Sequence, residues 1–132
     1  SKVFSWDVAV GFDPNYPSIS SKDNTAYFGK GLVMEKYTGS RGKYSATDAN
    51  AEYLAQIRKC MDDQNIVYQF AELGKIDAGG GGTIAYIVAN LNMEVIDAGI
   101  PVQNMHAPFE VTSKADVYEA YLGYKAFLEY MN

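Results

Sequence analysis

The stretch that decides the fold is GKGLVMEKYTGSRGKYSATDANAEYLAQIRKCMDDQNIVYQFAE, residues 29–72. Its start, 29–37, and its end, 66–72, are rich in β-branched and apolar residues and predict two strands. Between them, 38–48 contains two glycines and several small polar residues and predicts a loop. In residues 49–65, apolar side chains recur with the spacing of an amphipathic helix. A strand, a helix and a second strand in succession favour an α/β fold.

The helix of this unit has recognisable ends. Thr47 or Asp48 is expected to be its N-cap, because both side chains can accept hydrogen bonds from the free N–H groups of the first turn. Glu52 in the first turn suits the helix dipole, and Asn65 is expected to end the helix. The apolar stripe predicted to face the core is Leu54, Ile57 and Met61.

Further elements are expected on both sides of this unit. Residues 2–10 alternate in the manner of a strand, and 11–24, with two prolines and several serines, predict a long loop. Residues 83–91 are apolar on nearly every face and predict a helix buried on most sides. Residues 93–97 and 100–105 predict two short strands. The order of strands and helices favours an α/β layered fold with a largely parallel sheet.

The last expected element is a helix that begins at Ser113, with Asp116 three residues later as a variant of the capping box. Large apolar residues recur along it with helical spacing, which predicts an amphipathic helix whose core-facing stripe they form. These residues are Val117, Tyr121, Tyr124 and Leu128.

Composition excludes several classes of protein. The chain has 132 residues, enough for one domain with a core, and a net charge of −5 without any basic run, which argues against nucleic acid as a partner. No apolar stretch approaches the roughly 20 residues that span a bilayer. The single cysteine, Cys60, rules out an internal disulfide and a cysteine-rich zinc motif. The chain lacks an initiator Met and enters a strand almost at once, so we expect either a part of a longer protein or a trimmed chain.

Three features could carry chemistry, each placed where ligands gather in α/β sheets. Asp7 is expected in an apolar strand, where a carboxylate must be paired, hydrogen-bonded or metal-bound unless it faces water. The glycines 79–82 precede a helix and could hold a phosphate, a carboxylate or an oxyanion, or could serve a tight turn demanded by close packing. His106, the only histidine, either binds a ligand or is a hydrogen-bonded core residue. One histidine and one aspartate do not complete a zinc site.

Four segments taken together are more specific: SWDVAVGFDPNYP (5–17), GKGLVMEKYTGSRGK (29–43), DAGGGGTIA (77–85) and MHAPFEVTSKADVYEAY (105–121). In order and spacing they resemble the final third of the catalytic domain of the aspartyl aminopeptidases, cytosolic dinuclear zinc exopeptidases that form tetrahedral dodecamers. The resemblance implies a three-layer α/β sandwich with a mixed, mostly parallel sheet flanked by helices. It also implies that residues 1–132 form the C-terminal portion of one catalytic domain, in the cytoplasm.

The resemblance implies roles for particular residues. Asp7 would supply a carboxylate to one zinc ion, and His106 would ligate the other. Asp77 and the run Gly81, Gly82 and Thr83 match the loop that lines the substrate pocket. The implied function is that of a metal-dependent aminopeptidase that removes N-terminal residues from peptides. Two zinc ions would be bound, and a water molecule between them becomes a nucleophile near neutral pH.

The chain departs from the family pattern at three positions, in a way closer to a divergent bacterial branch. Many members carry histidines three and six residues after the ligand aspartate, where this chain has Val10 and Asp13. A substrate-reading lysine often stands where this chain has Glu35, with Lys36 one place on. A shift of one residue along a strand reverses the face. A preference for acidic N-terminal residues is therefore not implied.

In the family, the first histidine ligand, a bridging aspartate, an adjacent glutamate pair that includes the general base, and a dimerisation domain all precede this region. The chain is thus expected to hold two of five metal ligands and no general base, and to be inactive alone. Two other hypotheses stay open. One is a small α/β module that binds phosphate or another anion, with a structural His106; the other is an assembly fragment without a site.

Overall fold

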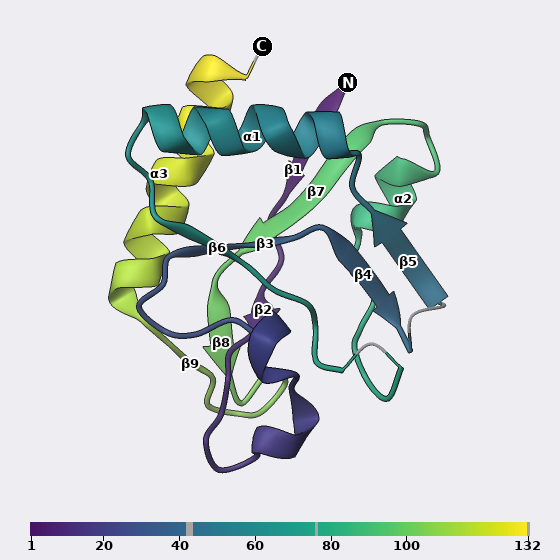
Figure 1. Ribbon diagram of the computed structural model, residues 1–132, viewed down its shortest axis with the longest axis vertical. Helices are drawn as coiled ribbons and strands as arrows, with labels where there is room; N and C mark the ends of the chain where they lie inside the picture. Colours follow the sequence, from purple (N-terminus) through teal and green to yellow (C-terminus); the bar gives the residue numbers. More distant parts are fainter. Residues whose placement is uncertain (42–43, 76, 132) are drawn as a thin grey trace.

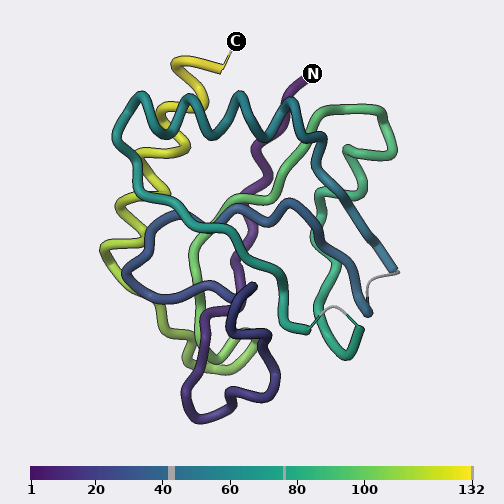
Figure 2. The backbone as a smooth tube through the Cα atoms, viewed as in Figure 1, coloured from purple at the N-terminus to yellow at the C-terminus, as the bar shows by residue number. Residues whose placement is uncertain are grey.

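The computed structural model describes residues 1–41, 44–75 and 77–131 of the chain and shows strands and helices that alternate along it (Figure 1). No helix in these ranges is both long enough and apolar enough to cross a membrane. The long segment after β2 contains two 3-10 helices, Pro17–Ile19 and Lys22–Asn24, and lies at the opposite end of the molecule from α1 (Figure 2). The other elements are β1 (Lys2–Ser5), β2 (Ala9–Val10), β3 (Leu32–Glu35), β4 (Tyr37–Ser40), β5 (Tyr44–Asp48), α1 (Ala51–Asp63), β6 (Tyr68–Phe70), α2 (Ala85–Ala89), β7 (Glu94–Gly99), β8 (Pro101–Gln103), β9 (Val111–Thr112) and α3 (Lys114–Tyr130).

The central sheet has four strands in the order β1-β7-β3-β6. β1 runs parallel to β7 and β3 runs parallel to β6, whereas β3 and β7 are antiparallel. The opening stretch of the sequence forms the parallel pair β3 and β6, with α1 in its crossover. A smaller sheet, β2-β8-β9, continues from the ends of β1 and β7. The expected α/β fold with a mixed, mostly parallel sheet is confirmed.

Two helices cover one face of the central sheet. Successive side chains of a strand point to opposite faces, so alternate residues of β1, β3 and β7 face α1 and α3. Burial of these side chains is the main source of stability for a domain of this size. On the opposite face, the segment that begins at Thr83 and continues into α2 packs against β7. The buried core between the sheet and the two long helices includes Phe4, Leu32, Met34, Ile96, Ala98, Tyr53, Ile57, Met61, Ala120 and Ala126.

α3 does not use the predicted stripe of large residues. Val117, Tyr121 and Leu128 are exposed, Leu128 to 71%, and only Tyr124 is half-buried. The helix instead lies close to the sheet through small residues. A Cβ on Gly123 would lie 2.9 Å from Leu32 Cδ2, so a larger side chain there would force Leu32 or the helix to shift. The fully buried positions of α3 are Asp116, Ala120, Gly123 and Ala126.

Residues 38–48 were predicted as a loop but contain most of an antiparallel hairpin, β4 and β5. Thr38 and Thr47 are buried and lie directly opposite each other. β-branched residues fit such a pairing, and this outweighs the turn-forming residues around it. Residues 42 and 43, which the prediction also placed in the loop, lie outside the described residues.

The N-cap of α1 also differs from the one predicted. Thr47 and Asp48 belong to β5 and therefore cannot cap the helix. Asn50 is the N-cap, and its side-chain oxygen accepts hydrogen bonds from the backbone N–H groups of Glu52 and Tyr53 at 2.8 and 3.5 Å. The other end agrees with the sequence, because α1 stops at Asp63 and Asn65 follows with a left-handed backbone (φ 56°).

The helix expected over 83–91 is shorter and less buried than predicted. α2 covers only Ala85–Ala89, and Ile84, Ile87 and Leu91 are exposed, Ile84 to 62%. The prediction rested on apolar character alone, which does not show whether other elements are present to cover each face of a helix.

The strand expected over 2–10 is interrupted, and Asp7 lies in the break between β1 and β2. Here the chain leaves the central sheet for the smaller one, in step with the passage from β7 to β8. Ala9 N donates to Ile100 O at 2.9 Å, which keeps the two chains side by side through the bend. A Cβ on Gly99 would lie 1.5 Å from Asp7 O, so only glycine permits this approach. The bend therefore fixes Asp7 at the carboxyl end of β1.

Candidate metal centre and substrate cavity

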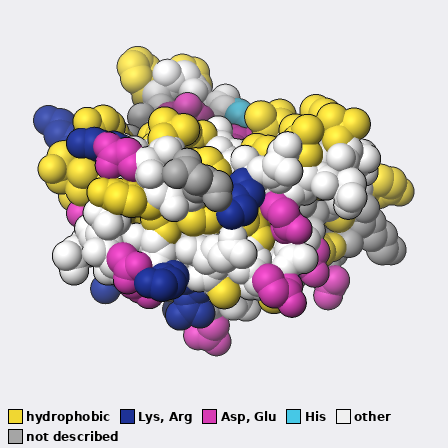
Figure 3. Space-filling model, turned by 90° about the horizontal axis from the view of Figure 1, so that it is seen from above, with side chains coloured by type: hydrophobic (Ala, Val, Ile, Leu, Met, Phe, Trp, Pro, Cys, Tyr) yellow, Lys and Arg dark blue, Asp and Glu magenta, His cyan; other side chains and the backbone are white. Residues whose placement is uncertain are grey.

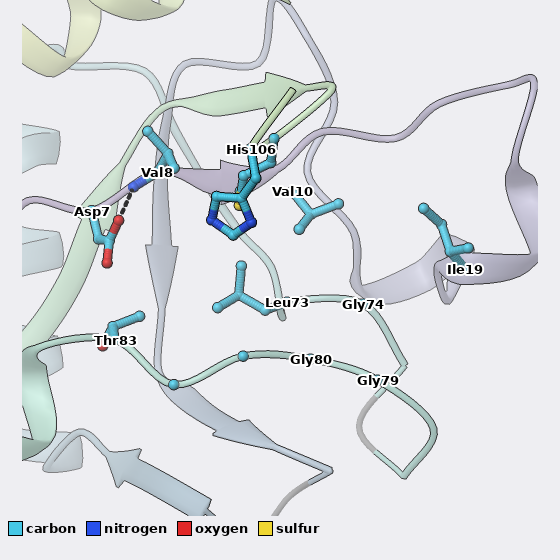
Figure 4. Close-up of a pocket in the computed structure, with 13 residues that line it drawn as sticks. Asp7, Val8, Val10, Ile19, Leu73, Gly74, Gly79, Gly80, Thr83 and His106 are labelled. Carbon is cyan, nitrogen blue, oxygen red and sulfur yellow. Dashed lines mark hydrogen bonds between the residues drawn. The ribbon is translucent and has the colours of Figure 1, made fainter. Parts of the chain in front are cut away.

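Asp7, the glycine loop and His106 line one cavity of about 340 Å³ (Figure 4). They come from three distant parts of the sequence, and the sheet topology brings them together as expected for the ends of strands. Asp7 and His106 are the only ionisable side chains among the described lining residues. Most of the remaining wall is apolar, from Val8, Val10, Ile19, Leu73 and Met105.

Asp7 is half-buried, and one of its oxygens is already engaged. Oδ1 accepts a hydrogen bond from the backbone N–H of Val8 at 2.8 Å. The second carboxylate oxygen points into the cavity, on the side of Thr83 (Figure 4). The contact to Val8 fixes the orientation of the carboxylate, which leaves an oxygen with lone pairs directed at the cavity.

His106 lies in the loop between β8 and β9, and its imidazole projects into the cavity toward Leu73 (Figure 4). It is exposed, and Figure 3 shows the single histidine at the surface with hydrophobic side chains beside it. Its backbone is left-handed, with φ at 68°, and its N–H donates to Glu110 Oε1 at 2.8 Å. His106 is therefore not a core residue, which removes one of the two interpretations left open by the sequence.

The glycine loop packs closely against the hairpin of β4 and β5. Gly80 has φ at 84°, and a Cβ there would lie 2.9 Å from Gly39 O. A Cβ on Gly82 would lie 2.5 Å from Ser45 Cβ. Close packing thus explains two of the glycines, while Gly81 and Gly82 also present backbone to the cavity. The close packing expected of a tight turn is confirmed at these two glycines, and the binding of an anion stays a prediction.

The remaining residues expected in the pocket differ in position. Thr83 lines the cavity, but its hydroxyl donates to Asp97 Oδ2 at 2.5 Å and so is committed to the buried side. Asp77 is exposed in a turn and is not among the residues that line the cavity. The structure therefore brings Gly81, Gly82 and Thr83 together with Asp7 and His106, and leaves Asp77 outside.

Behind the wall formed by Asp7 and Thr83 lie two buried carboxylates. Asp97 and Glu35 are 2% and 4% exposed and face each other across β7 and β3. Burial raises the pKa of Glu35 well above its ordinary value, and the negative charges of Asp97 and Asp7 raise it further. Burial also raises the pKa of Asp97, although the hydrogen bond from Thr83 opposes this change. Both shifts favour the neutral acids over the carboxylates at a given pH.

The sequence reading named Glu35 only as a departure and did not name Asp97. A carboxylate in an apolar strand needs a partner, whether at Asp7 or at Asp97 in the segment MEVID. Asp97 could therefore have been identified from the sequence on the same grounds as Asp7. Neither Glu35 nor Lys36 lines the cavity. Lys36 instead pairs with Asp48, with 2.5 Å between Nζ and Oδ1.

The donor atoms on the cavity wall fit zinc as part of a ligand set. A carboxylate oxygen and an imidazole nitrogen are both common zinc ligands, and a protein site normally provides three or four. Within the described ranges, no group of three or more His, Cys, Asp or Glu residues could hold a metal ion. Asp7 and His106 can therefore contribute to a zinc site and cannot form one by themselves.

Comparison with known proteins agrees with this geometry. A probable M18 family aminopeptidase 1 from Clostridium acetobutylicum is 56% identical over 128 residues, which cover 97% of this chain and 28% of the relative. The crystal structure of an M18 aminopeptidase from Thermotoga maritima has a TM-score of 0.93 at 44% identity, over 97% of this chain and 28% of that chain. The crystal structure of aminopeptidase I from Clostridium acetobutylicum has a TM-score of 0.92 at 55% identity, again over 97% and 28%.

This chain thus spans about 28% of the length of these relatives. The family model that it matches is described as aminopeptidase I zinc metalloprotease, and the match runs over residues 1–128. The resemblance drawn from the sequence segments is confirmed, and the chain belongs to the M18 family of aminopeptidase I zinc metalloproteases.

Proposed function

We propose that this chain is part of a zinc aminopeptidase that removes N-terminal residues from peptides, and that it supplies two metal ligands and one wall of the substrate cavity. The observation that carries the proposal is the placement of Asp7 and His106 on the same cavity. Family membership adds support, because the family model is described as a zinc metalloprotease.

Within this proposal, the Oδ2 atom of Asp7 and the imidazole of His106 hold zinc. Zinc, when bound, makes a coordinated water acidic enough to act as a nucleophile near neutral pH. The apolar side chains of the cavity exclude water and accept the side chain of the N-terminal residue. Gly81, Gly82 and Thr83 form the wall opposite His106. Asp77 would act only if the rest of the protein brings substrate to its turn.

The remaining parts of the site are assigned to the rest of a longer protein. These are the other ligands of the two zinc ions and the general-base glutamate. We also propose a homo-oligomer, a dodecamer, in the cytoplasm. A structure titled as the mApe1 dodecamer of S. cerevisiae has a TM-score of 0.73 at 20% identity, a likeness of fold alone. The assembly of this chain is an inference from family membership.

Zinc analysis of the full-length protein tests the two ligands. We expect Asp7→Asn and His106→Ala each to remove at least one zinc ion per protomer, measured by plasma mass spectrometry after dialysis. Hydrolysis of aminoacyl p-nitroanilides should fall by about 100-fold or more, as expected when a metal ligand is lost. Asp23→Asn, an exposed acid that is not among the residues lining the cavity, is the matched control and should retain zinc and activity.

Full zinc content in both variants would contradict the proposal. The anion-binding hypothesis makes the opposite prediction, because it leaves metal content independent of His106 and requires inorganic phosphate to bind at the glycine loop. Phosphate titration of the same variants by calorimetry distinguishes the two. The structure offers little to support phosphate, because α2 is a single short helix and most of the cavity wall is apolar.

A further inference from the structure

The loop that presents His106 to the cavity has an unusual backbone. Asn104 and His106 both have positive φ, 59° and 68°, within three residues. Residues with a Cβ adopt this conformation at an energetic cost, and outside glycine it is seen most often for asparagine, aspartate and histidine. His106 therefore holds this conformation only where the surrounding contacts enforce it.

Few hydrogen bonds enforce the conformation. Ala107 N donates to Asn104 O at 2.9 Å, which closes a tight turn around Met105 and His106. The N–H of His106 donates to the side chain of Glu110, with 2.8 Å between N and Oε1. A carboxylate is a stronger acceptor than a neutral oxygen, so this contact is the strongest one available to the turn.

Glu110 is itself fixed by its position in the chain. It immediately precedes β9, whose Val111 and Thr112 pair with Gln103 and Val102 of β8. Thr112 Oγ1 also donates to Pro101 O at 2.9 Å. The paired strands thus anchor Glu110 on one side of the loop, and its carboxylate reaches across to the backbone of His106 on the other.

The direction of the imidazole follows from this backbone. The Cα–Cβ bond of His106 is set by its φ angle, and in the left-handed conformation it directs the ring into the cavity that Asp7 also lines (Figure 4). Without the acceptor, the backbone could relax to a negative φ, which would turn the ring away. The side chain of Glu110 is exposed and is not among the residues that line the cavity, so it acts on the site through His106.

We propose that Glu110 is a positioning residue for the metal centre, which holds His106 in its ligand conformation by accepting the backbone N–H. The inference rests on the proposed function, since it takes His106 as a zinc ligand. Glu110 would then affect zinc affinity although it is not itself a zinc ligand. Partners of this kind around a ligand histidine typically change metal affinity by about 10- to 100-fold when they are removed.

The test compares Glu110→Ala with Glu110→Gln in the full-length protein. Zinc affinity is measured by competition with a chromogenic chelator, independently of catalysis. We expect about 10-fold or greater weakening at one site in Glu110→Ala. Glu110→Gln keeps an amide oxygen that can accept the same N–H, and should bind within about twofold of the parent protein. Thermal unfolding of the metal-free variants should give the same midpoint for both, because the side chain is exposed.

The outcomes separate this inference from the proposed function. His106→Ala is measured in parallel and gives the affinity expected when the ligand is absent. Loss of zinc in His106→Ala with parent-like affinity in Glu110→Ala overturns the inference and leaves the function intact. Equal weakening in Glu110→Ala and Glu110→Gln overturns it as well, because charge rather than the hydrogen bond would be responsible. Parent-like zinc binding in His106→Ala overturns both.

Discussion

Glu35 and Asp97 show how a few buried side chains can make a fold depend on pH. Ser5, Asp97 and Glu35 lie on neighbouring strands in register, on the face of the sheet away from the main core. Two carboxylates in such a place repel each other when both are ionised, and each loses its hydration. Thr83 donates to Asp97 Oδ2, while Asp97 Oδ1 and Glu35 Oε1 have no hydrogen-bond partner. Burial and the charges of Asp97 and Asp7 raise the pKa of Glu35 well above its ordinary value, so its ionisation is unfavourable in the folded state.

We predict that Glu35→Gln stabilises the metal-free protein at pH 8 and changes its stability little near pH 4. The pKa of Glu35 is raised in the folded state, so its favourable contribution is present below the ordinary pKa of about 4.5. That contribution is lost as the pH rises through the folded pKa. Glutamine has the same shape and cannot ionise, so it avoids this loss. Each unit of difference in pKa between the folded and unfolded states corresponds to about 1.4 kcal/mol of unfolding free energy.

Urea unfolding at the two pH values, with a chelator present, measures the difference. Lys36→Gln serves as the neighbouring control, since it alters charge at an exposed ion pair next to Glu35. Its effect should be below about 1 kcal/mol at either pH. An equal effect of Glu35→Gln at pH 4 and pH 8 would show that its charge is not what destabilises the fold.

At the scale of single residues, the sequence predicted which residues line the cavity better than it predicted their hydrogen bonds. Asp7 and His106 were chosen because of their residue types and because of the family resemblance, and both line the cavity. The commitment of the Thr83 hydroxyl to Asp97 could not be predicted, since it depends on the packing of two segments that only the fold brings together. The same holds for the approach of Glu110 to the backbone of His106.

At the scale of elements, α3 is held to the sheet by one buried acid as well as by small residues. The sequence predicted Asp116 as part of a capping box, but the side chain of Ser113 makes no cap hydrogen bond. Asp116 instead accepts hydrogen bonds from the backbone N–H groups of Gly29 and Gly31, at 2.9 and 2.8 Å. These glycines form the turn that leads into β3. The carboxylate thus fastens the last helix to the start of a central strand.

We predict that Asp116→Ala destabilises the fold by about 2–4 kcal/mol, because the buried N–H of Gly31 and the partly buried N–H of Gly29 lose their acceptor. Asp116→Asn retains one acceptor oxygen and should cost roughly half as much. Chemical denaturation measures both. Glu129→Gln removes an exposed acid from the same helix and should change stability by less than about 0.5 kcal/mol. An alanine variant as stable as this control would show that the two contacts contribute nothing.

The errors at this scale share a physical cause. The stripe from Val117 to Leu128 has the spacing of a buried face, yet the sheet is covered by the adjacent small residues of α3. Periodicity identifies a helix and does not show how closely it must approach its neighbour. The hairpin of β4 and β5 was missed for a related reason. Its glycine and serine residues predict a turn, whereas the pairing of Thr38 with Thr47 becomes visible only when the two segments lie together.

At the scale of the whole molecule, the fold class followed from the order of elements, because strands that alternate with helices have few ways to bury their apolar faces. The bend that carries β1 into β2 could not be predicted in this way. It depends on Gly99 at a contact between two chain segments remote in sequence. That bend places Asp7 at the cavity, so the site depends on a feature of the tertiary fold more than on any local pattern.

The site on this chain is chemically partial, and this leads to a last prediction. Asp7 and His106 are two donors, and among the described lining residues no second carboxylate is available to act as a general base. We therefore predict that the 132-residue chain, expressed alone, hydrolyses an aminoacyl p-nitroanilide no faster than buffer in the presence of zinc. The full-length protein should be at least about 1000-fold faster under the same conditions, because general acid–base catalysis alone contributes 10²–10⁴-fold.

Two measurements make this comparison decisive. Far-UV circular dichroism must first show the helical signal of α1 and α3 in the 132-residue chain, so that inactivity reflects missing groups rather than an unfolded state. Hydrolysis is then measured with and without a chelator. Turnover by the folded chain that zinc sustains and the chelator abolishes would contradict the assignment, since Asp7 and His106 would then suffice for catalysis. Inactivity of the folded chain, together with activity of the full-length protein, places the general base and the remaining ligands outside these residues.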